Sequence, residues 1–84
     1  MRLRGKINMK VIVYTAPGCA FCVMVENFLK QNNIGFEEVD LSKDPDAAKR
    51  IYEKTGVRSV PVTEIDGKFV VGYDIKKLKE LLGL

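Results

Sequence analysis

The stretch Tyr14–Leu29, YTAPGCAFCVMVENFL, contains both cysteines of this 84-residue chain, spaced C-x-x-C. The run that leads into it, Lys10–Thr15 (KVIVYT), is β-branched and almost wholly apolar, which is typical of a strand buried on both faces. Pro17 and Gly18 then break the run. The pattern predicts a strand, a tight turn and a helix, with the two thiols where the helix begins.

The predicted helix runs from Cys19 to about Asn32. The run Asn32-Asn33-Ile34-Gly35 supplies its stop. Its apolar residues recur at the spacing i, i+4, i+7 and i+8, which makes one helix face; they are Phe21, Val25, Phe28 and Leu29.

A second strand and helix follow. Phe36–Leu41 (FEEVDL) is typical of a short strand. Ser42 or Asp44 can cap a helix that ends just before Gly56. We expect Ile51 and Tyr52 on the inward face of that helix.

The last third of the chain predicts a hairpin and a helix. Asp66-Gly67 between two β-rich segments is a strong hairpin signal. Asp74 is a candidate N-cap for a last helix, whose apolar stripe is Ile75, Leu78, Leu81 and Leu82. The order β-α-β-α-β-β-α requires a parallel first strand pair and an antiparallel hairpin. The expected fold class is therefore α/β, a small mixed sheet covered by helices.

Charge and hydropathy exclude several classes of function. Of 14 basic residues, Arg2, Arg4 and Lys6 lie in the first eight positions, and the other 11 balance the 11 acidic residues. We therefore expect residues 1–8 to be a flexible basic extension, residues 9–84 to form the domain, and no nucleic-acid-binding face. No apolar run approaches the ~18 residues of a membrane span, and no secretory signal is visible. A cytoplasmic protein without a membrane partner is the expectation.

The cysteine spacing next to a βαβ pattern indicates thiol redox chemistry. At the start of a helix, free N–H groups and the helix dipole stabilise the Cys19 thiolate and lower its pKa below the usual value of about 8.5. Cys22, one turn further in, is placed to resolve a mixed disulfide. Structural zinc prefers four Cys or His ligands, whereas this chain has two Cys and no His. A metal or iron–sulfur carrier would thus need two chains; we expect a monomer.

Three segments carry a resemblance to a known family. YTAPGCAFC (14–22) resembles the active-site segment of glutaredoxins, TGVRSVP (55–61) resembles their Thr-Gly-x-Arg-Thr-Val-Pro segment, and IDGKFVVGYD (65–74) resembles their last strand pair and its Gly-x-Asp loop. Together they extend from residue 14 to residue 74, in the right order. The resemblance implies a thioredoxin fold in its short glutaredoxin form, with four strands and three helices.

The resemblance also implies which residues form the site. Pro61 matches the family's cis-proline, which would turn the backbone of Val60 toward an extended peptide or glutathione. The other matched candidates for substrate binding are Pro17, Arg58, Ser59, Gly72, Tyr73 and Asp74. Tyr14 and Phe21 are candidates for an apolar rim around the thiols, although their spacing also fits the core.

The implied activity is dithiol reduction of protein disulfides or glutathionylated proteins, with no bound cofactor. The sequence does not decide which reductant restores the dithiol. Glutathione-using members usually carry a Lys where this chain has Ala16. The ending GYDIKKLKELL (72–82) resembles the glutaredoxin-like electron donors of ribonucleotide reductase, which take electrons from thioredoxin reductase. Glutathione and a thioredoxin reductase are therefore both candidate partners.

Overall fold

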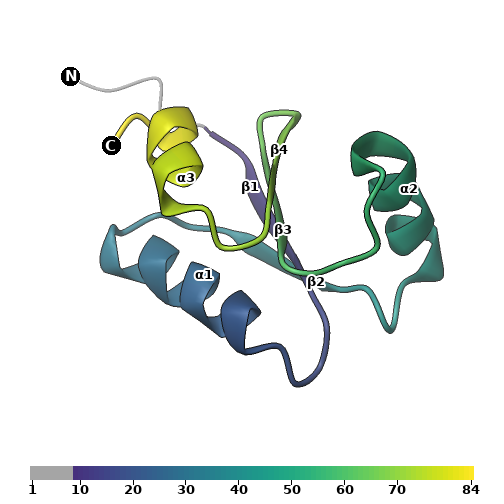
Figure 1. The fold of residues 1–84 in the computed structure, drawn as a ribbon. Helices are drawn as coiled ribbons and strands as arrows, with labels where there is room; N and C mark the ends of the chain where they lie inside the picture. The colour runs from purple at the N-terminus through teal and green to yellow at the C-terminus, as the bar shows by residue number, and fades with distance from the viewer. Residues whose placement is uncertain (1–8) are drawn as a thin grey trace.

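Strand β1 (Val11–Thr15) lies inside a four-stranded sheet whose order is β2-β1-β3-β4 (Figure 1). The structure is a computed structural model that describes residues 9–84. β2 (Glu37–Asp40) pairs parallel to β1, while β3 (Val62–Ile65) pairs antiparallel to β1 and to β4 (Lys68–Val71). The predicted mixed sheet is confirmed, with Lys10, Phe36 and Leu41 just outside their strands. The basic extension 1–8 lies outside the described residues.

Helices cover both faces of this sheet (Figure 1). α1 (Ala20–Gln31) and α3 (Ile75–Leu82) lie on one face, and α2 (Pro45–Thr55) lies on the other. Alternation along β1 serves both layers, because Val11 and Val13 pack toward α1 and α3 while Tyr14 packs toward α2.

Each layer has its own apolar core. The larger one consists of Val11, Val13, Val25, Leu29, Ile65, Val70, Leu78 and Leu82. The smaller one, under α2, consists of Tyr14, Ala47, Ile51 and Val62. No described helix has the length and apolar character needed to cross a membrane.

The helix ends follow the capping signals of the sequence. Asp44 accepts a hydrogen bond from the Ala47 N–H at 3.1 Å, and Asp74 accepts one from the Lys77 N–H at 3.1 Å. Gly56 ends α2 with a left-handed φ of 78°. The choice between Ser42 and Asp44 as the cap of α2 is thus decided for Asp44.

The predicted hairpin turn is also confirmed. Asp66 and Gly67 both have positive φ, 50° and 85°, as a type I′ turn requires. Two inward-facing predictions are wrong: Tyr52 and Phe21 are exposed. α2 buries Ala47 and Ile51, four residues apart, and this turns Tyr52 toward solvent. In α1, Cys22 takes the core position of the first turn instead of Phe21.

Thr63, on β3, has a fully buried side chain whose Oγ1 atom has no hydrogen-bond partner among residues 9–84. Replacing it in T63V removes the buried hydroxyl, so we expect the free energy of unfolding to rise by about 1 kcal/mol. Urea unfolding measures this change if the free energy of unfolding depends on urea concentration with the same slope in both proteins.

Thr55 provides the matched control. Its Oγ1 donates to the Ile51 carbonyl at 2.8 Å and accepts from the Val57 N–H at 3.2 Å. T55V should therefore lower the free energy of unfolding by about 1 kcal/mol. If T63V and T55V change the free energy of unfolding equally, the presence of a hydrogen-bond partner for the hydroxyl does not decide whether stability rises or falls.

Candidate active site

The two cysteines lie where the turn after β1 enters α1. Cys19 is the N-cap of α1, and its Sγ accepts a hydrogen bond from the Cys22 N–H at 3.1 Å. Gly18 allows the turn because its φ is +74°. The two sulfurs are joined as a disulfide, with the Cα atoms 5.3 Å apart. The helix thus directs its free N–H groups at the sulfur of residue 19.

The two sulfurs differ in exposure. Cys22 is only 3% exposed and packs with the core, whereas Cys19 is partly exposed at the surface. A molecule in the solvent therefore reaches the sulfur of Cys19 before that of Cys22.

The three segments matched in the sequence converge at this point. The Val60–Pro61 peptide bond is cis, and the Pro61 carbonyl accepts a hydrogen bond from the Gly72 N–H at 2.8 Å. That bond holds the loop of Tyr73 beside the start of α1. The rings of Phe21 and Tyr73 stack there, with centroids 6.4 Å apart.

The Phe21–Tyr73 pair forms an aromatic rim next to the disulfide. Phe21 is 58% exposed and Tyr73 is 40% exposed. The rim expected for Phe21 is therefore consistent with the structure, whereas Tyr14, only 1% exposed, cannot belong to it. The correction follows from the strand pattern, which turns the Tyr14 side chain toward α2.

Tyr14 instead belongs to a polar network beneath α2. Its hydroxyl donates to Glu64 Oε1 at 2.8 Å and accepts from Arg50 Nη2 at 2.8 Å. Burial is the main cause that raises the pKa of Tyr14. The network links β1, β3 and α2, so the role of Tyr14 is to hold the fold together.

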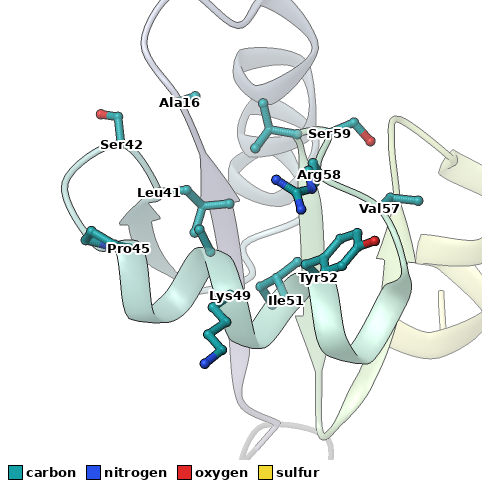
Figure 2. A pocket seen from close by; sticks show the side chains of 12 residues that line it. Ala16, Leu41, Ser42, Pro45, Lys49, Ile51, Tyr52, Val57, Arg58 and Ser59 are labelled. Atoms are coloured by element: carbon teal, nitrogen blue, oxygen red, sulfur yellow. The ribbon is translucent and has the colours of Figure 1, made fainter.

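A groove of about 640 Å³ runs from the active-site turn along α2 (Figure 2). Ala16 and Val60 border it, as do the predicted residues Arg58 and Ser59. The Arg58 guanidinium lies 4.5 Å from the centre of the Tyr52 ring. Figure 2 shows the Arg58 side chain next to the Tyr52 ring, while the Lys49 side chain extends away from both.

Sequence reasoning missed that Tyr52 lines this groove, because its helical spacing fits burial as well as exposure.

The structure also shows where two other predicted residues lie. Pro17 is exposed in the turn between β1 and α1. Asp74 caps α3 through its Oδ1 atom, so that oxygen is already engaged.

A second cavity, of about 300 Å³, lies on the other side of the cysteines. Both cysteines line it, together with two acids, Glu26 of α1 and Glu38 of β2. The pKa of Glu26 is raised to about 7, mainly by burial, and further by hydrogen bonding to and repulsion from Glu38; Lys30 opposes the rise. Sequence reasoning did not single out either acid.

Comparison with known proteins agrees with this geometry. The family model described as Glutaredoxin matches residues 11–70. The chain belongs to the glutaredoxin family.

The chain also has individual relatives. The SPbeta prophage-derived thioredoxin-like protein YosR of Bacillus subtilis is 41% identical, over 88% of this chain and 95% of that protein. The glutaredoxin-like protein NrdH of Lactococcus lactis is 30% identical, over 84% of this chain and 97% of that protein. The crystal structure of the thioredoxin-like protein BC3987 superposes with a TM-score of 0.79 at 44% identity, covering 86% of this chain and 99% of that one. The thioredoxin-like fold in its glutaredoxin form is thereby confirmed.

The raised pKa of Glu26 predicts a pH-dependent stability. Because the folded-state pKa, about 7, exceeds the ordinary 4.5, the folded protein holds the proton longer, and stability falls as pH rises from 4.5 to 7. E26Q removes this titration. We expect E26Q to gain stability over the wild type across that window, reaching about 1 kcal/mol at pH 8 after allowance for solvent screening.

Urea unfolding of both proteins between pH 4 and pH 8 measures the difference. E37Q, which changes an exposed acid on strand β2, is the matched control and should leave the pH dependence as it is in the wild type. A constant difference between E26Q and the wild type over the whole range would contradict the prediction.

Proposed function

We propose that this protein is a thiol–disulfide oxidoreductase that reduces protein disulfides or glutathione mixed disulfides by a dithiol mechanism. The observation that carries the proposal is the asymmetry of the cysteine pair. Cys19 caps α1 and is partly exposed, while Cys22 is buried one turn later. A helix N-terminus favours the thiolate, which is the attacking species in thiol–disulfide exchange.

The reaction proceeds in two exchanges. The Cys19 thiolate attacks one sulfur of the target disulfide, the target S–S bond breaks, and the first target thiolate leaves. Cys22, as the thiolate, then attacks Cys19 Sγ; the bond between Cys19 and the target breaks, and the second target thiolate leaves. Two electrons have passed to the target, and the Cys19–Cys22 disulfide awaits re-reduction by a small thiol or a reductase.

Single substitutions of the two cysteines should behave differently. C22S should accumulate a covalent mixed disulfide with the target because nothing resolves it, whereas C19S should form none. Mass spectrometry of the acid-quenched mixtures measures both species. Full disulfide-reducing activity in both variants would contradict the proposal, and a trapped adduct in C19S alone would reverse the two roles.

The groove along α2 suits an extended peptide such as glutathione. No hydrogen bond within residues 9–84 engages the Val60 backbone, and Arg58 supplies a cation on the same wall. Ala16, at the turn, is the position where glutathione-using family members usually carry a Lys. The missing contact is charge-assisted, a type typically worth about 1.5–3 kcal/mol, or one to two decades of affinity.

Restoring that cation should strengthen the use of glutathione. We expect A16K to raise the rate of glutathione-dependent re-reduction about tenfold at low glutathione concentration. The control variant A20K places a cation on the other side of Cys19, outside the groove, and should bring no such gain. Equal glutathione rates for A16K and the wild type would show that glutathione does not use the groove at this position.

A reductase-coupled electron donor to ribonucleotide reductase is the second candidate within the same chemistry. The ending at residues 72–82 and the likeness to the Lactococcus lactis glutaredoxin-like protein NrdH support it. The oxidised protein is given glutathione with glutathione reductase in one assay, and NADPH with thioredoxin reductase in another. Faster recovery of thiols in the second assay favours the electron donor, and faster recovery in the first favours the glutathione-dependent enzyme.

A further inference from the structure

Glu26 lies one helical turn after Cys22 on α1, at the i+4 position. Side chains at this spacing are neighbours on the helix surface. Both residues line the cavity of about 300 Å³ beside the disulfide. The Glu26 Oε2 atom is buried and has no hydrogen-bond partner among the described residues.

Glu38 approaches the same cavity from β2. In the parallel pairing of β1 and β2, Glu38 is the register partner of Val13, whose side chain packs against α1. Neighbouring register partners share a sheet face, so Glu38 lies on the α1 side of the sheet. Two carboxyl groups from different elements thus meet beside the sulfurs, and a hydrogen bond can join them only when one carries a proton.

We propose that Glu26 accepts the proton of the Cys22 thiol when Cys22 resolves the mixed disulfide, and that Glu38 positions and tunes the Glu26 carboxyl for this task. This inference rests on the proposed function and names the proton path within it.

The resolving step moves one proton and one electron pair. The Cys22 S–H bond breaks, and the proton moves to the Glu26 carboxylate. The Cys22 thiolate attacks Cys19 Sγ, the Cys19–Cys22 bond forms, and the bond from Cys19 to the target sulfur breaks. The target leaves as a thiolate that has received the electron pair, and Glu26 then returns the proton to the departing thiolate or to bulk solvent. A small thiol or a disulfide reductase later supplies the electrons that restore the dithiol.

The charges around the cavity favour this role. Apart from the cysteines, the titratable groups that line it within residues 9–84 are Glu26 and Glu38, and Lys30 acts on Glu26 from along α1. The pKa of Glu26, about 7, matches the neutral range in which a general base works best. Cys22 itself, at 3% exposure, has little direct contact with bulk water to receive its proton.

The test follows the resolving step alone. The mixed disulfide of Cys19 with a model target is formed, and its decay is followed by acid quench and mass spectrometry from pH 5 to pH 9. We expect the wild-type rate to rise through an inflection near pH 7. E26Q should resolve at least tenfold more slowly at pH 7 and lose the inflection, because general-base catalysis typically contributes about 10²–10⁴-fold.

Two further variants separate proton transfer from a structural effect. E38Q removes the facing charge and should move the inflection to lower pH. E37Q, on the same strand but outside the cavity, should match the wild type. In a C22S background, alkylation of Cys19 should proceed at the same rate with and without the E26Q substitution, since the attacking step does not involve the acid.

The outcomes are distinguishable from those of the proposed function. If the wild type forms no mixed disulfide with any target, the proposed function fails. If the wild type turns over and E26Q resolves with the same rate and pH profile, only the role of Glu26 is overturned. An E26Q rate that falls equally at every pH, with the inflection kept, would likewise overturn it.

Discussion

The packing of α1 against β1 is the constraint on which the site depends. Cys22, Val25 and Leu29 form the buried stripe of the helix, and all three contribute to the core. With that stripe fixed, the chain has only four residues between the end of β1 and the start of α1, and Cys19 is the last of them. The stripe therefore decides that one sulfur faces the interior while the other caps the helix. The chemical asymmetry of the pair is a consequence of ordinary core packing.

The order of strands brings the remaining parts to the same place. Because β3 pairs directly with β1, the segment before β3, which contains Val60 and Pro61, lies beside the turn that follows β1. β4 then returns Gly72 to the Pro61 carbonyl and brings Tyr73 to the ring of Phe21. Three segments distant in sequence thus meet through strand pairing and two local contacts. The α2 groove begins at this meeting point, and it therefore lies next to the turn that carries Cys19.

Local patterns were enough to predict most of the fold. The caps Asp44 and Asp74 and the Asp66-Gly67 turn act within a few residues of themselves, so their signals are complete in the sequence. The errors concern side chains whose facing depends on a distant element. Spacing alone does not show which of Ile51 and Tyr52 is buried, and the exposure of Phe21 depends on where α1 begins relative to the sheet.

The sequence likewise predicted some features of the candidate site and missed others. The motif and the resemblance correctly predicted the place of the two cysteines at the start of α1 and the cis Val60–Pro61 bond. The ring contact of Phe21 with Tyr73 and the acid pair of Glu26 with Glu38 were not, because each joins elements whose register no local pattern encodes.

Glu26 is the residue whose presence is explained least by the stability of the fold. A carboxylate with a buried oxygen and a second acid opposite lowers the stability of the folded state at neutral pH, since both burial and repulsion disfavour its charged form. Replacement by an amide would remove the charge at nearly unchanged size. Departures from local stability rules are expected at functional sites. The departure here lies one helical turn from the buried sulfur of Cys22, where the proton transfer that we propose would use a group that binds and releases a proton near neutral pH.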